Sequence, residues 1–198
     1  MPADFEKQSY WHERFSSETS FEWLVPSDTF TSMLEPYLAR LGKTARILQL
    51  GFGTSDLQNH LRSRGFRDVT NVDYEPLAID RGVDHEKQAF GDVVMKYAVA
   101  DVTQLSRERL SGKFDLIVDK STVDAVACGG DSILLRMASG IRERLAEGGV
   151  WVSLSFSSSR FDVGGLPFQV EVIAKVPTPK LKPNDPDIFH WCYLLRPA

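Results

Sequence analysis

Ile47-Leu48-Gln49-Leu50-Gly51-Phe52-Gly53-Thr54-Ser55 decides the fold, because it joins a short apolar strand to a turn that requires glycine. Gly51 and Gly53 let the backbone bend, and they let a bound molecule approach without a Cβ in the way. Residues 54–56 then offer N-cap oxygens to a helix that runs toward Arg64. A strand, a glycine turn and a helix N-terminus form the first unit of a nucleotide-binding α/β fold.

The residue after this stretch selects among cofactors. Asp56 stands where a dinucleotide-binding turn carries its third glycine. A carboxylate at that place repels a pyrophosphate, so NAD and FAD are disfavoured. A cofactor with a positive charge and no phosphates suits the turn better, and S-adenosylmethionine has both properties. Its amino-acid carboxylate can accept hydrogen bonds from the turn, whereas its ribose hydroxyls need an acceptor from the next strand.

That acceptor is Asp73, the last residue of the β-branched run Val69-Thr70-Asn71-Val72-Asp73. It follows Gly51 by 22 residues, close to the spacing at which a second-strand carboxylate meets a ribose. The alternative is that Asp73 is a turn residue at a strand end. Tyr74 comes directly after it and can stack on an adenine ring.

Asp101 ends the third predicted strand and is expected to accept from the adenine exocyclic amine, while the Val102 N–H pairs with a ring nitrogen. The alternative for Asp101 is that it only caps a helix over residues 103–109.

Composition excludes several classes of function. The chain has 198 residues, of which 42% are hydrophobic and 25% charged, as expected for one globular domain. Its net charge of −4 argues against a nucleic-acid partner, because phosphate contacts need clustered Lys and Arg. Cys128 and Cys192 show no metal-ligand spacing, so we expect no metal. Without a signal pattern or a long apolar run, the sequence predicts a soluble, cytoplasmic protein and no membrane partner.

Hydrophobic periodicity predicts an α/β fold with seven strands. They cover residues 47–50, 69–73, 95–100, 113–119, 150–156, 168–176 and 189–195. The first five alternate with helices and the last two are consecutive, which indicates a mostly parallel sheet ending in an antiparallel hairpin. The connection over residues 177–186 is expected to be extended.

Helices are expected on both sides of these strands. Two amphipathic segments precede the first strand, over residues 4–16 and from Pro26 onward. A helix after Pro76 should turn Leu77, Ile79 and Val83 inward, and a helix over 131–147 should end at Gly148-Gly149.

With these acids and glycines at strand ends, the chain resembles the class I S-adenosylmethionine-dependent methyltransferases, which have a Rossmann-like fold. Residues 10–15 (YWHERF) are similar to a YWxxRY opening, residues 21–24 (FEWL) to a Y/F-x-W-hydrophobic segment, and residues 119–125 (DKSTVDA) to D/E-K-G-T-L-D-A. Those segments mark a small eukaryotic group related to the lysine methyltransferases of translation elongation factor 1-alpha. The chain departs from that group at LGFGTS, which replaces LGCGNS, at Ser121, which replaces glycine, and at Phe15, which lacks a tyrosine hydroxyl.

The resemblance implies a single methyltransferase domain over 1–198, in which an N-terminal helical segment, 1–44, covers the cofactor site of a sheet core, 45–198. The expected cofactor contacts are Trp11, Phe15, Trp23, Gly51, Gly53, Asp73, Tyr74, Asp101, Val102 and Lys120. Apart from the resemblance, the three N-terminal aromatics read as core packing and the lysine as a solvated loop charge.

Methyl transfer from a sulfonium needs positioning of the acceptor rather than a protein nucleophile. A lysine acceptor is only about 0.1% neutral at physiological pH, so a carboxylate must align it and allow proton loss. Asp119 is the expected catalytic residue, with Asp124 as the other candidate unless it caps a helix.

The leading hypothesis is a protein lysine methyltransferase, with a protein substrate such as a translation factor. The shortened loops on the substrate side favour a small-molecule methyltransferase instead. The changes at Phe52, Thr54 and Ser121 leave a third alternative, a cofactor-binding regulatory subunit without turnover.

Overall fold

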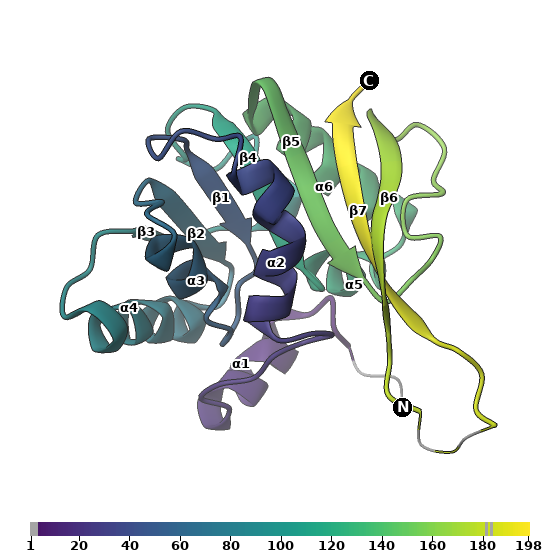
Figure 1. Cartoon of the computed structure of the whole chain (residues 1–198), viewed down its shortest axis with the longest axis horizontal. Coiled ribbons are helices and arrows are strands. Elements are labelled where there is room, and N and C mark those ends of the chain that lie inside the picture. The colour runs from purple at the N-terminus through teal and green to yellow at the C-terminus, as the bar shows by residue number, and fades with distance from the viewer. Residues whose placement is uncertain (1–3, 181, 183) are drawn as a thin grey trace.

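A computed structural model describes residues 4–180, 182 and 184–198, and its centre is a seven-stranded sheet (Figure 1). The strand order is β3-β2-β1-β4-β5-β7-β6. Only β7 runs antiparallel to its neighbours, as the sequence predicts. The predicted connection over 177–186 includes Leu181 and Pro183, which lie outside the described residues. The strands are β1 (Ile47–Leu50), β2 (Val69–Asp73), β3 (Lys96–Val99), β4 (Phe114–Lys120), β5 (Leu145–Ser155), β6 (Phe168–Pro177) and β7 (Phe189–Pro197).

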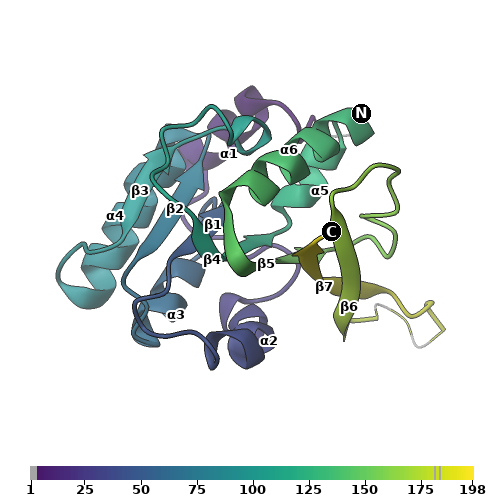
Figure 2. The same cartoon turned by 90° about the horizontal axis from the view of Figure 1, so that it is seen from above.

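Helices cover both faces of the sheet (Figure 2). They are α1 (Gln8–Ser17), α2 (Ser27–Leu38), α3 (Leu57–Ser63), α4 (Pro76–Phe90), α5 (Thr122–Ala127) and α6 (Asp131–Arg144), with a 3-10 turn η1 (Val102–Gln104). Alternate strand residues serve the two faces, because successive side chains point to opposite sides. Ile47 packs in the cluster that contains α2 and α3, whereas Leu48 packs in the cluster that contains α5 and α6.

Strand register brings the predicted site residues to one edge. Leu50 of β1 pairs with Val72 of β2 and with Asp119 of β4. The residues that follow these three positions therefore lie side by side at the carboxyl ends of the parallel strands. That edge is where open α/β sheets bind ligands.

Two predicted helices are wrong in extent. The segment over 103–109 forms only the short η1 turn, and α6 ends at Arg144 rather than at residue 147. The Arg144 guanidinium explains both, since it donates to the carbonyls of Leu105, Glu108 and Leu110 and fixes that segment in an irregular path. Leu145 already pairs with Phe114, so Gly148 and Gly149 lie in an irregularity of β5 instead of capping a helix.

The inner face of α4 is also shifted from the prediction. Ala78, Gly82 and Glu86 are its buried residues, while the predicted inner positions are only partly buried. Gly82 lies against the rings of Phe52 and Tyr97, where a Cβ would come within 2.7 Å of each. Close packing against two aromatic rings therefore selects the smallest side chain for the buried face, which a search for large apolar residues misses.

Candidate active site

A cavity of about 590 Å³ opens at the carboxyl edge of the sheet. Every residue predicted to contact the cofactor lines it: Trp11, Phe15, Trp23, Gly51, Gly53, Asp73, Tyr74, Asp101, Val102 and Lys120. Residues from α1 and the chain that follows it thus meet residues from the ends of four strands. Their roles toward a ligand remain predictions, and their geometry follows.

The glycine turn has the backbone that the sequence predicts. Gly51 and Gly53 have φ of +56° and +55°, in the left-handed region that favours glycine. A Cβ on Gly51 would lie 2.4 Å from the Thr122 side chain. Thr122 Oγ1 donates to the carbonyl of Leu50 over 2.9 Å, which holds the start of α5 against the end of β1.

Asp73 lies under this turn with its side chain almost fully buried. Its Oδ2 accepts from the Gly53 N–H over 2.9 Å, and its Oδ1 accepts from the Glu75 N–H over 3.0 Å. Burial raises the pKa of Asp73 to about 6, although these hydrogen bonds oppose the rise. The carboxylate faces the cavity ionised at neutral pH, with lone pairs left for a ligand.

Asp101 performs the capping role that the sequence left open. Its Oδ1 accepts from the N–H and hydroxyl of Thr103, and its Oδ2 accepts from Gln104 over 2.8 Å. These bonds fix the η1 turn and the orientation of Val102, which is also at the cavity wall. A contact of Asp101 with adenine stays a prediction.

The N-terminal aromatics pack in the core and also line the cavity, which were the two alternatives that the sequence left open. Phe15 is 2% exposed and packs with Phe52 and Ala78, so it is a core residue as well as a cavity wall. Trp11 bridges Phe15 and Trp23, with ring centroids 5.5 and 5.9 Å away. The aromatic group therefore forms one continuous side of the cavity.

Asp119, which the sequence predicts to be the catalytic residue, does not have that position in the structure. It is completely buried and, within the described part of the chain, does not line the cavity. Its Oδ1 accepts from the Val123 N–H and its Oδ2 from the Trp151 indole over 2.8 Å. Asp119 is the penultimate residue of β4, on the face that packs under α5, and therefore holds strands and helix together. A group without access to the cavity cannot align a methyl acceptor.

Asp124 is the carboxylate that does reach the cavity on this side. Its Oδ1 accepts from Arg160 Nε over 2.9 Å, and its Oδ2 accepts from the Phe156 N–H over 3.0 Å. Burial raises the pKa of Asp124, against the effect of Ser155 and Arg160. The ion pair with Arg160 neutralises this charge and ties α5 to the loop after β5.

Sequence reasoning missed Gln49, which also lines the cavity. Its side chain is buried, and its Oε1 has no hydrogen-bond partner among the described residues. The sequence did contain a signal for it, because Gln49 is the one amide inside the apolar strand β1. A buried acceptor without a donor, in the same cavity as Asp73 and Asp101, suits a cationic ligand that carries N–H groups, as S-adenosylmethionine does. Other missed lining residues are Phe5, Cys128, Ile133 and Phe156.

Comparison with known proteins agrees with this chemistry. No protein-family model matches the chain. The chain is 60% identical over 200 residues to Methyltransferase srdJ of Neurospora crassa, covering 100% of the chain and 85% of that protein. It is 29% identical to the eEF1A lysine and N-terminal methyltransferase of Danio rerio, which aligns with 78% of the chain; the chain spans only 22% of that relative's length.

A solved structure has the same fold. The N-methyltransferase NodS of Bradyrhizobium japonicum, in complex with S-adenosylhomocysteine, superposes with a TM-score of 0.68 at 17% identity, covering 95% of this chain and 99% of its own. No helix in the described ranges is long and apolar enough to cross a membrane. The sheet order, the cavity and the relatives agree: the chain belongs to the class I S-adenosylmethionine-dependent methyltransferases, and S-adenosylmethionine is its cofactor.

Proposed function

We propose that this methyltransferase acts on an uncharged small molecule. The observation that carries the proposal is the Asp124–Arg160 ion pair, which leaves the acceptor side of the cavity, as far as the described residues line it, without a free buried carboxylate. A lysine ammonium needs such a group to align it and to favour loss of its proton. An uncharged acceptor does not.

The cofactor is proposed to lie along the strand ends. Asp73 would accept hydrogen bonds from the ribose hydroxyls, each worth roughly 1.5–3 kcal/mol. Tyr74 would stack on the adenine, and the backbone at Val102 would pair with the adenine ring. The N-terminal aromatics would then exclude water from the sulfonium.

The wall beyond Asp124 supports an apolar acceptor. Cys128, Ile133 and Phe156 line this part, and Phe5 lines the same cavity from the N-terminal segment. The volume of about 590 Å³ lies in the range of small-molecule sites. In-line transfer to such an acceptor breaks the sulfonium–methyl bond, joins the methyl group to the acceptor atom and leaves S-adenosylhomocysteine; where the acceptor atom carries a proton, that proton then passes to solvent.

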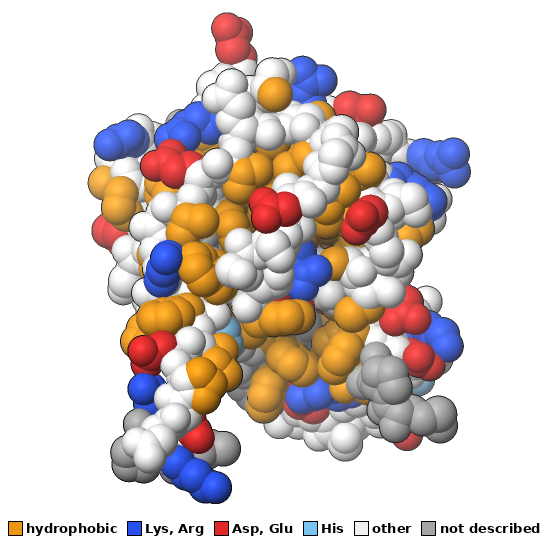
Figure 3. All heavy atoms as spheres, turned by 90° about the vertical axis from the view of Figure 1, so that its right-hand side faces the viewer, with side chains coloured by type: hydrophobic (Ala, Val, Ile, Leu, Met, Phe, Trp, Pro, Cys, Tyr) orange, Lys and Arg blue, Asp and Glu red, His pale blue; other side chains and the backbone are white. Residues whose placement is uncertain are grey.

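A protein lysine is the second candidate, and two observations favour it. Relatives such as the Danio rerio protein are named for lysine methylation of eEF1A. Hydrophobic side chains also gather around a hollow on the face that carries the β6 edge (Figure 3), and a protein substrate could dock there. Glu6 lines the cavity with an exposed side chain and would be the carboxylate available to an entering lysine.

The two candidates are separated by giving the protein methyl-labelled S-adenosylmethionine with an extract of its source organism, split by ultrafiltration. We expect label in a compound of the filtrate, reduced by Phe156→Ala and unchanged by Glu6→Gln. Asp73→Ala serves as the blank with weakened cofactor binding. Label on lysine in the protein fraction, reduced by Glu6→Gln, would overturn the small-molecule proposal.

A further inference from the structure

The chain between α1 and α2 forms one wall of the cavity. We call residues 18–25 the strap. Phe21, Trp23 and Leu24 of the strap line the cavity. Leu24 has φ of +65°, a conformation that a residue other than glycine rarely adopts. Contacts elsewhere must therefore hold the strap in this path.

Lys120, at the end of β4, supplies those contacts. Its Nζ donates to Glu22 Oε2 over 2.6 Å, to the Trp23 carbonyl over 3.0 Å and to the Val25 carbonyl over 3.3 Å. An ammonium has three N–H donors, and all three are used on the strap. The Lys120 side chain is only 4% exposed. It therefore has no N–H left for a cofactor, although Lys120 is one of the residues that line the cavity.

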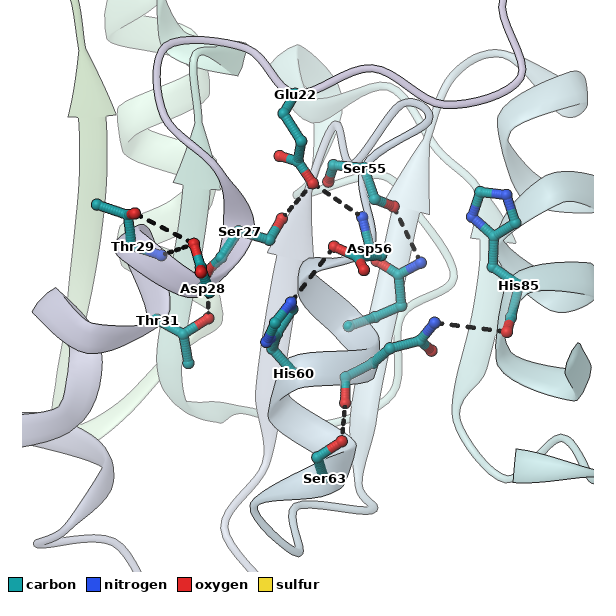
Figure 4. Close-up of polar contacts among 12 residues, drawn as sticks. Glu22, Ser27, Asp28, Thr29, Thr31, Ser55, Asp56, His60, Ser63 and His85 are labelled. Carbon is teal, nitrogen blue, oxygen red and sulfur yellow. Dashed lines mark hydrogen bonds and ion pairs between the residues drawn. The ribbon is translucent and has the colours of Figure 1, made fainter. Parts of the chain in front are cut away.

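The Glu22 carboxylate carries the connection further. Its Oε1 accepts from the Ser27 hydroxyl over 2.7 Å and from the Asp56 N–H over 3.4 Å, and Figure 4 shows it between these two residues. Ser27 begins α2, and Asp56 follows the glycine turn. One ion pair thus joins β4, α2 and the turn.

A second contact ties the strap to the glycine turn itself. Glu18 Oε1 accepts from Thr54 Oγ1 over 3.0 Å, and Glu18 also pairs with Arg14 of α1. Arg14 lies over the Trp23 ring at 4.6 Å, so it packs on the aromatic that lines the cavity. The position of the strap and the shape of the cofactor turn are therefore coupled.

We propose that Lys120 and Glu22 form a latch, which holds Phe21 and Trp23 over bound S-adenosylmethionine and sets how fast the cofactor leaves. Lys120 is then a positioning residue that acts through the strap rather than a cofactor contact. The inference depends on the cofactor and goes beyond the proposed acceptor. Replacing either residue leaves the charge of the other without its partner, and Lys120 is buried, so either single change should loosen the strap.

The test is the dissociation rate of S-adenosylhomocysteine, followed by tryptophan fluorescence in stopped flow. We expect Lys120→Met to raise this rate at least tenfold and Glu22→Gln to raise it by less. The double variant should release no faster than Lys120→Met, because both changes break the same contact. Lys120→Arg, which keeps the charge, should recover part of the wild-type rate.

Arg62→Met is the matched control. Like Lys120→Met, it removes a buried cation from its carboxylate partner, here Glu86, but neither Arg62 nor Glu86 lines the cavity. We expect it to lower stability and leave the dissociation rate unchanged. A wild-type rate in Lys120→Met, or an equal acceleration in Arg62→Met, would overturn the latch. If Lys120→Met does not fold, the rate in Glu22→Gln decides, since that side chain is 29% exposed and tolerates the change.

Discussion

At the scale of single residues, Ser121 stands out because it holds a backbone conformation that favours glycine. It precedes α5 with φ of +71°, a conformation that suits glycine. The methyltransferase group that the sequence resembles has glycine at this position. The serine therefore holds this backbone conformation at some energetic cost.

Ser121→Gly is expected to raise the free energy of unfolding by up to about 1 kcal/mol, because the steric strain removed exceeds the entropy that glycine adds. Urea unfolding measures the change. Ser121→Ala, which keeps the Cβ, should not stabilise the protein. A less stable Ser121→Gly variant would show that the serine hydroxyl, 3.5 Å from Asp124, matters more than the strain.

At the scale of elements, Asp119 joins β4, β5 and α5 by accepting from Trp151 and from the Val123 N–H. Burial raises the pKa of its carboxyl to about 7, which these hydrogen bonds only partly oppose. The folded protein therefore favours the protonated form more than the unfolded chain does. This contribution to stability is complete below about pH 4 and is lost as the pH rises through 7.

Asp119→Asn removes that titration, so the stability gap between wild type and variant should narrow as the pH rises. Between pH 5 and pH 8 we expect the gap to shrink by roughly 2–3 kcal/mol. Unfolding by denaturant at both pH values gives the two gaps. A gap that is the same at both would contradict the raised pKa.

The elements also show what a sequence can predict. All seven strands were predictable because β-branched and apolar runs between turn residues report burial directly, as in β2 and β4. The end of α6 was not predictable, because it depends on hydrogen bonds from Arg144 to carbonyls of another segment. The inner face of α4 was not predictable either, because Gly82 is buried on that face and has no side chain that would mark it as apolar.

At the scale of the whole molecule, parallel register places the strand ends together, so the cavity residues at Gly51, Asp73 and Asp101 could be predicted from sequence. The direction in which a side chain turns at that edge could not be predicted from sequence. Asp119 and Lys120 are adjacent on β4 and point to opposite faces, one into the core and one to the strap. The roles of Asp119 and Lys120 depend on their hydrogen-bond partners, Trp151 and Glu22.

The central claim is that this edge binds S-adenosylmethionine through Asp73, and calorimetric titration into wild type and Asp73→Ala tests it most directly. We predict micromolar binding to wild type at pH 7.5 and at least about tenfold weaker binding to the variant, from the lost ribose hydrogen bonds. Because the pKa of Asp73 is about 6, wild-type affinity should fall at pH 5.5 and that of the variant should not. No binding to wild type, or equal affinities of the two proteins at pH 7.5, would contradict the account.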